Sequence, residues 1–283
     1  MPEGHTIRRL ADRHRALFAG RRVTVTSPQG RFTEGAGLLS GRVLRDADAY
    51  GKHLFHRYDA GRTLHVHLGL YGRFTDGDGP PPPPVGEVRL RMSTRAHWLE
   101  LRGPAVCEVL DPPSVDALLA RLGPDPLRSD ADPDRAYRRI GRSDQPLLAL
   151  LLDQSVVAGA GLIYVTEVLF RAGLPPTTPG RELSPAAWRE IWADLVALMH
   201  EGVANGRIDT VHSAHTPEAM GRAPRVDRHG GEVYVYRRAG YPCLVCGDTV
   251  RTGTLAARNT FWCPTCQPAV ASALTSARSA TAR

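Results

Sequence analysis

The apolar positions of the chain follow two different spacings, one after the other. Over residues 5–19, Ile7, Leu10, His14 and Leu17 recur every three or four positions, which places them on one face of a helix. Apolar and polar residues then alternate in short stretches between Gly-rich turns, as they do in half-buried strands. The clearest stretches are Arg22–Thr26, Thr63–Leu68, Glu87–Met92 and Trp98–Arg102. The pattern predicts an N-terminal helix followed by an antiparallel sandwich or barrel.

Helical spacing returns in the second half of the chain. A stretch rich in Pro and Asp, Asp111–Asp134, predicts a boundary that contains one short helix. Helical patterns then cover Leu147–Leu152, Leu162–Ala172 and Ser184–Asn205. After Val270 the chain is rich in Ala, Ser, Thr and Arg, which predicts a disordered tail. The sequence therefore predicts an α+β multidomain protein.

Composition excludes some classes of protein. Of the 283 residues, 42% are hydrophobic and 23% are charged, as in an ordinary globular protein. No apolar run approaches the ~18 residues that a membrane span needs. The first ten residues lack the apolar core of a signal peptide. We therefore expect a cytoplasmic protein with no membrane segment.

The charge of the chain favours a polyanionic partner. The formal net charge is +7, and residues 220–283 hold nine Arg against Asp227, Glu232 and Asp248. A solvated Arg-rich surface with no partner is the alternative. Lys52 is the only lysine, so we expect it to serve a purpose that Arg cannot, unless its presence is accidental.

Four of the five cysteines have the spacing of a metal site. Cys243 and Cys246 form one Cys-x2-Cys pair, and Cys263 and Cys266 form a second pair after sixteen intervening residues. Two such turns complete a tetrahedral zinc site with no open position, which predicts one structural Zn²⁺ in a zinc-ribbon hairpin. Cys107, between apolar neighbours, is expected in the core.

The N-terminus offers a nucleophile. Removal of Met1 ahead of the small Pro2 leaves a free prolyl amine, a secondary amine that can attack an aldehyde-level carbon and form an iminium ion. An α-amino group titrates at about 7.7–8.0, so part of it is neutral near physiological pH. Glu3 could supply a proton to a leaving oxygen. Many proteins begin in this way by accident, so this pattern alone decides nothing.

Five motifs in one order carry a resemblance to a known family. They are Pro2-Glu3-Gly4, Gly51-Lys52, His67-Leu68-Gly69, a run from Asp153-Gln154 through Gly159, Gly161, Ile163-Tyr164 and Glu167, and a run from Arg258 through Thr260 and Trp262 to Cys263-Pro264-x-Cys266-Gln267. Together they resemble the bacterial formamidopyrimidine-DNA glycosylase and endonuclease VIII family of base-excision repair enzymes. The resemblance covers about residues 2–268.

The resemblance implies a fold and a partner. The family fold is a β-sandwich with an N-terminal helix, a helix–two-turn–helix domain and a zinc hairpin, with damaged double-stranded DNA in the cleft between them. On this basis we expect a catalytic sandwich domain over 1–125, a helical DNA-binding domain over 126–235, a zinc-finger hairpin over 236–270 and a tail over 271–283. We also expect a monomer.

The resemblance also implies the chemistry. After the damaged nucleotide is flipped out, Pro2 attacks C1′ of the deoxyribose, the base leaves, and successive β- and δ-elimination release both phosphates. Glu3 protonates the sugar ring oxygen, and Lys52 contacts phosphate at the lesion. A compact ammonium suits that role, which agrees with the single lysine of the chain. A solvated strand end is the alternative for Lys52.

Other positions are expected to bind DNA. The helix that begins near Gly161 presents backbone N–H groups to a phosphate, and Arg258 grips the backbone beside the flipped nucleotide; the alternative for Arg258 is a surface residue. The chain departs from the family at Leu162, where Asn is usual, so one phosphate contact is expected to be missing or supplied by another residue. It departs again at Thr6, where many members have Glu, with consequences for proton relay or base recognition.

The damaged base is the least determined property. Leu70 and Tyr71, on the turn between Gly69 and Gly72, resemble the endonuclease VIII wedge that fills the space of the flipped nucleotide. This favours oxidised pyrimidines, although a core corner of the sandwich is the alternative for the two residues. Two other functions stay open: an oxidised-purine glycosylase with a pocket loop within 205–235, and a non-catalytic zinc-ribbon protein that binds damaged DNA.

Overall fold

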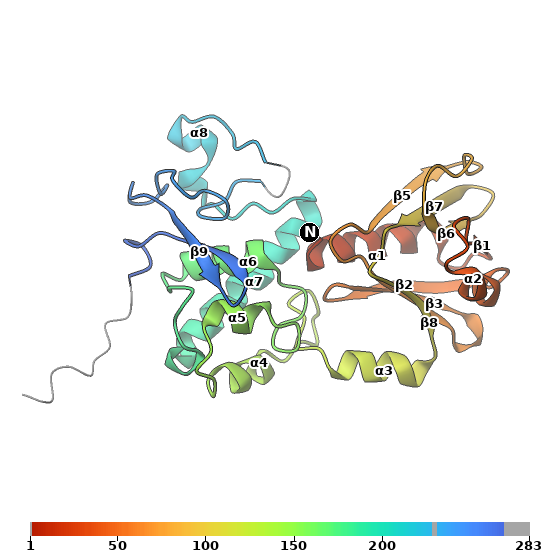
Figure 1. Cartoon of the computed structure of the whole chain (residues 1–283), viewed down its shortest axis with the longest axis horizontal. Helices are drawn as coiled ribbons and strands as arrows, with labels where there is room; N and C mark the ends of the chain where they lie inside the picture. Colours follow the sequence, from red (N-terminus) through yellow and green to blue (C-terminus); the bar gives the residue numbers. More distant parts are fainter. Residues whose placement is uncertain (1, 228–230, 269–283) are drawn as a thin grey trace, which may run out of the picture.

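The computed structural model describes residues 2–227 and 231–268. Figure 1 shows β-sheets at one end of the molecule, helices at the other, and the N-terminus between them. No helix in the described ranges is long and apolar enough to cross a membrane. The tail predicted over 271–283 lies outside the described residues.

Two four-stranded antiparallel sheets form the N-terminal part, so the predicted sandwich is confirmed over a barrel. One sheet has the order β1-β6-β7-β5 and the other has the order β2-β3-β4-β8. The strands are β1 (Thr24–Thr26), β2 (Leu44–Tyr50), β3 (His53–Tyr58), β4 (Thr63–His67), β5 (Arg73–Asp78), β6 (Val88–Ser93), β7 (His97–Arg102) and β8 (Val106–Leu110). Each of the four predicted strands lies within two residues of its observed bounds. In β6, buried and partly exposed residues alternate along the strand. This alternation explains why the period-2 pattern in the sequence located the four strands.

Helix α1 (Gly4–Phe18) packs on the sheets as the N-terminal pattern predicted. Ile7, His14 and Leu17 are buried, while Leu10 lies at the edge of the buried face. His14 Nδ1 lies 2.9 Å from Nε2 of the equally buried His56 on β3. The helix thereby ties the chain terminus to the sandwich core. A short helix, α2 (Thr33–Leu39), and a 3-10 turn, Asp59–Gly61, complete this part.

The predicted boundary contains helix α3 (Pro112–Ala120), which lies below the sheets in Figure 1 and leads into the helical half. Asp111 caps it by accepting the N–H of Ser114 at 3.0 Å, and Pro at the first helical position suits the start. The helices that follow are α4 (Pro133–Ile140), α5 (Leu147–Leu152), α6 (Leu162–Arg171), α7 (Pro185–Asn205) and α8 (Pro217–Met220), with 3-10 turns at Gly180–Glu182 and Ser213–His215. The three helices predicted in this half end within one residue of the observed bounds.

Helix α6 lies at the centre of the helical half. Its residues 163–170 are all buried, and they join Trp188, Leu195 and Met199 of α7 in one core. Burial on every side explains why this helix is apolar around most of its circumference. The packing of α6 in this core fixes the position of its first turn, at Gly161 and Leu162, relative to the sandwich.

The C-terminal part of the described chain is the predicted hairpin. Strand β9 (Arg251–Leu255) pairs with β10 (Arg258–Trp262) in antiparallel register, with Leu255 opposite Arg258. The two-residue turn between them, Ala256-Ala257, has positive φ at both positions, which matches the twist of a tight hairpin. Arg258 therefore lies beside the hairpin tip.

Candidate active site

The chain terminus docks on the first turn of α6. Glu3 is 3% exposed, and its carboxylate oxygens accept the N–H groups of Gly161 and Ile163, both at 3.0 Å. The N–H of Gly4 donates to the carbonyl of Gly159 at 2.9 Å. A Cβ at Gly161 would lie 2.4 Å from Glu3 Cδ, so the approach depends on glycine. A carboxylate at a helix N-terminus is also stabilised by the helix dipole.

Gly161 therefore has a partner that the sequence did not predict. We expected its backbone N–H to face a phosphate, and in the structure that group is buried and donates to Glu3. A phosphate at this turn would have to bind another donor. The neighbouring Leu162, which departs from the family pattern, lines the cavity beside Glu3.

Burial shifts the pKa of Glu3 and of Lys52 in opposite directions. Desolvation raises the pKa of Glu3, against the opposing effects of Lys52 and of the backbone N–H groups. Desolvation lowers the pKa of Lys52, against the attraction of Glu3 and with added repulsion from Arg258. Lys52 is thus close enough to Glu3 and to Arg258, which come from separate segments of the chain, to be affected by both charges. Lys52 does not match the alternative of a solvated strand end.

The turn that carries Lys52 is held by close backbone packing. Gly51 has φ +56°, and a Cβ there would lie 3.0 Å from Ala158 Cβ. Its N–H donates to the buried carboxylate of Asp125 at 2.8 Å. Because Ala158 is near the start of α6, this turn places Lys52 on the same side of the molecule as Glu3.

A cavity of about 760 Å³ opens between the two halves of the molecule beside Glu3. Leu70 and Tyr71 form part of its wall and are 59% and 84% exposed. The turn that presents them is closed by the N–H of Gly72, which donates to the Leu68 carbonyl at 3.0 Å. Such exposure is incompatible with the alternative of a core corner, and it suits side chains that contact a partner.

The opposite wall of the cavity contains residues that sequence reasoning did not single out. The expected pocket loop, 205–235, contributes several lining residues, and the wall continues to Tyr236 and Arg237. Residues 228–230 lie outside the described part of the chain. The lining residues of this wall are Gly206, Arg207, Ile208, Arg225, Asp227, Gly231, Tyr236 and Arg237. No short motif marks them, because loop positions become neighbours only through the fold.

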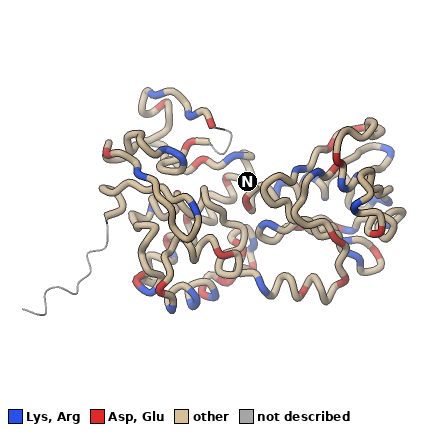
Figure 2. Tube along the Cα trace, in the orientation of Figure 1, with Lys and Arg blue, Asp and Glu red and all other residues tan. Residues whose placement is uncertain are grey.

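Arg258 is apart from this cavity. It lines a smaller hollow with Leu148 and Asp153 of the helical half. Figure 2 shows Lys and Arg positions on both halves of the molecule near the N-terminus. The two cations expected to contact DNA, Lys52 and Arg258, come from separate parts of the sequence.

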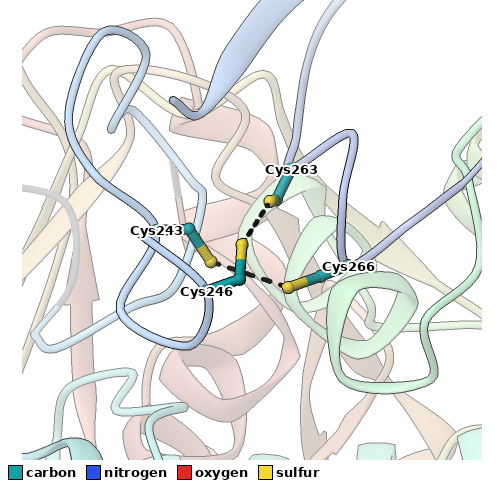
Figure 3. Close-up of side chains that lie close together, drawn as sticks. All are labelled: Cys243, Cys246, Cys263 and Cys266. Atoms are coloured by element: carbon teal, nitrogen blue, oxygen red, sulfur yellow. Dashed lines mark hydrogen bonds between the residues drawn. The ribbon is translucent and has the colours of Figure 1, made fainter. Parts of the chain in front are cut away.

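The four cysteines of the two pairs converge at the base of the hairpin. Their Sγ atoms all lie within 4.8 Å of one another. Figure 3 shows Cys243 facing Cys266, with the Sγ atoms 3.8 Å apart, and Cys246 facing Cys263, with the Sγ atoms 3.4 Å apart. Four thiolates at such separations fit tetrahedral Zn²⁺. Cys107 lies elsewhere and is only partly buried, so its expected core position is correct only in part.

The zinc site is joined to the helical half. Gln267 Nε2 donates to the Leu174 carbonyl, after the end of α6, at 2.8 Å. Thr265 Oγ1 donates to Asp248 Oδ2 at 2.7 Å and links the two cysteine turns. The ion would hold the hairpin, and with it Arg258, in a defined position on α6.

Three family models match successive parts of the chain. They are the formamidopyrimidine-DNA glycosylase N-terminal domain over residues 1–104, the formamidopyrimidine-DNA glycosylase H2TH domain over 122–213 and the zinc finger found in FPG and IleRS over 240–269. Endonuclease 8 1 of Mycobacterium tuberculosis is 51% identical over 274 residues, which cover 94% of this chain and 100% of that protein. The chain belongs to the Fpg and endonuclease VIII family.

Further members of the family agree with this assignment. The formamidopyrimidine-DNA glycosylase of Parasynechococcus marenigrum is 34% identical, covering 94% of this chain and 99% of that protein. The Lactococcus lactis Fpg in complex with DNA containing an abasic site has a TM-score of 0.77 at 21% identity, covering 94% and 99% of the two chains. The last comparison supports the fold alone. The expected family, fold, DNA glycosylase/AP lyase class and structural zinc are confirmed.

Proposed function

We propose that this enzyme is a bifunctional DNA glycosylase and AP lyase that removes oxidised pyrimidines from double-stranded DNA, with Pro2 as the nucleophile. The observation that carries the proposal is Glu3, a buried carboxyl with a raised pKa, next to Pro2 and at the wall of the 760 Å³ cavity. A raised pKa keeps a carboxyl protonated at higher pH, as a general acid requires.

In the proposed reaction, the Pro2 nitrogen forms a bond to C1′ while the bond from C1′ to the base breaks. The electron pair of that bond leaves with the base, which gains the proton that the Pro2 amine releases. Glu3 donates its proton to the ring oxygen, the ring opens, and the product is an iminium ion. Loss of a C2′ proton then expels the 3′ phosphate, and loss of a C4′ proton expels the 5′ phosphate. Water releases the sugar fragment and restores the proline amine.

The other site residues have positioning roles in this proposal. Lys52 binds a phosphate at the lesion as a compact cation, and Arg258 binds the backbone beside the flipped nucleotide. Leu70 and Tyr71 enter the space that the nucleotide leaves. We expect the protein to act as a monomer in the cytoplasm.

Two observations support pyrimidines over purines. The relative at 51% identity is named Endonuclease 8 1, whereas the formamidopyrimidine-DNA glycosylase relative of Parasynechococcus marenigrum is 34% identical. The exposed pair Leu70-Tyr71 also matches the wedge expected for that branch. Excision rates on duplexes with thymine glycol, 5-hydroxycytosine, 8-oxoguanine or formamidopyrimidine would test this preference. Faster excision of the two purine lesions would reverse it.

Borohydride trapping on an abasic-site duplex, followed by mass mapping of the linked peptide, tests the proposal as a whole. We expect attachment at Pro2. Attachment at Lys52 would keep the reaction class and overturn the nucleophile. Absence of an adduct, with zinc present and DNA bound, would indicate a protein that binds damaged DNA without cleaving it.

A further inference from the structure

Two neighbouring polar side chains of α1, His5 and Thr6, line the cavity and have no part in the reaction proposed above. Thr6 is partly exposed, and its Oγ1 lies 3.2 Å from His5 Nε2. Both are within three residues of Glu3 and belong to the first turn of the helix. A flipped nucleotide that reaches Pro2 therefore has to pass close to them.

His5 is held firmly in place. It is 5% exposed, and its ring meets the ring of Tyr164 edge-on, with centroids 5.4 Å apart. Gly202 of α7 also packs against it, because a Cβ at that position would lie 3.2 Å from His5 Cγ. Burial lowers the pKa of His5 to about 4, so the ring is neutral at physiological pH. A neutral imidazole has one N–H donor and one bare acceptor nitrogen.

The surroundings of His5 decide which nitrogen carries the proton. Nδ1 is buried and has no hydrogen-bond partner among the described residues. A buried N–H without an acceptor is rarer in proteins than a buried acceptor without a donor. The proton therefore belongs on Nε2, which donates to Thr6 Oγ1. This bond occupies one lone pair of the Thr6 oxygen and leaves the hydroxyl proton available to another group.

We propose that Thr6 contacts the flipped base as a neutral hydrogen-bond donor to a base oxygen, and that His5 is the positioning residue that orients the Thr6 hydroxyl. This inference rests on the proposed function, since it needs a base in the cavity. The substrate class is oxidised bases that present a carbonyl or hydroxyl oxygen toward α1. A carboxylate at position 6 accepts hydrogen bonds but donates none, so it would be a poor substitute for this contact.

Single-turnover base excision from a thymine glycol duplex tests the contact, with cleavage of a preformed abasic site as the internal control. Thr6→Val removes the hydroxyl at constant shape, and we expect excision to slow about tenfold while abasic-site cleavage changes less than about twofold. Thr6→Ser should keep most of the excision rate, and Thr6→Glu should lose it. Thr24→Val, on an exposed position of β1 away from the cavity, is the matched control.

The positioning role of His5 has its own variant. His5→Phe keeps an aromatic ring against Tyr164 but removes the Nε2 donor. We expect slower excision of thymine glycol with abasic-site cleavage preserved, and little further loss when Thr6→Val is added, because both changes remove the same contact.

Four outcomes would count against the inference. Equal excision by Thr6→Val and the wild-type enzyme would overturn it, as would an equal loss of excision and abasic-site cleavage, which indicates a purely structural role. Independent losses for the two variants would overturn the coupling of His5 to Thr6. If the wild-type enzyme forms no borohydride adduct and excises no base, the proposed function fails, and the inference fails with it.

Discussion

The carboxylate of Glu167 accepts the backbone N–H of Tyr236 at 2.8 Å, from a position on α6 with no solvent exposure. The same carboxylate accepts the N–H groups of Tyr234 and Val235 and the hydroxyl of Thr210. It thereby determines the course of the chain at Tyr236, which forms part of the cavity wall. The glutamate of the family motif is thus a structural anchor for the cavity, although it lies outside it.

Replacing Glu167 with Gln should destabilise the protein. The amide would direct a donor toward backbone N–H groups, and charge-assisted bonds are worth about 1.5–3 kcal/mol each. We expect the free energy of unfolding to fall by about 2–4 kcal/mol, measured by urea denaturation. Glu201→Gln, exposed on α7, is the control and should change it by less than about 0.5 kcal/mol. Equal denaturation midpoints for the two variants would contradict the anchor.

Replacing Gly161 with Ala should impair catalysis. The added Cβ would lie 2.4 Å from Glu3 Cδ and force the carboxyl out of its position on the first turn of α6. We expect single-turnover base excision to fall at least about tenfold, since a misplaced catalytic group can cost about a hundredfold. In Gly141→Ala the nearest atom would be 3.4 Å away, so that variant should keep its activity. A fully active Gly161→Ala enzyme would show that the position of Glu3 is not critical.

Stability should fall as the solution is acidified below about pH 6.5, because of buried neutral histidines. Burial lowers the pKa of His56 from 6.5 to about 4, so between these values the unfolded chain binds a proton that the folded protein excludes. The unfolded state is therefore favoured as pH falls, by about 2 kcal/mol at pH 5 for this residue. Urea denaturation at pH 7.5 and pH 5 measures the difference. His56→Gln, which does not titrate, should reduce it, and an unchanged difference would show that His56 is not responsible.

Loss of one zinc ligand should release the ion and weaken DNA binding. Cys263→Ser removes one of four thiolates, and the remaining three leave an incomplete site. We expect zinc content, measured by elemental analysis, to fall from one ion per chain toward none, with weaker binding to an abasic-analogue duplex. Cys107→Ser is the control, because Cys107 is outside the cluster. Retention of both zinc and DNA affinity by Cys263→Ser would exclude the structural role.

Local patterns were sufficient to predict the elements of the fold. The alternation of residues in β6 and the helical spacing in α1 each follow from one buried face, and burial of one face depends on sequence spacing alone. The zinc ligands were predictable for a similar reason, because each Cys-x2-Cys pair forms one tight turn. The domain bounds 1–125, 126–235 and 236–270 stay predictions.

Contacts between distant segments could not be predicted from the sequence. The partner of Gly161 is Glu3, 158 residues away, and only the docking of the N-terminal segment on the first turn of α6 brings the two together. The same holds for the raised pKa of Glu3 and the lowered pKa of Lys52, because desolvation depends on everything packed around a group. The sequence by itself determined which residues could perform the chemistry. The tertiary structure decided which of them meet, since distance, burial and hydrogen-bond partners arise only when separate elements pack.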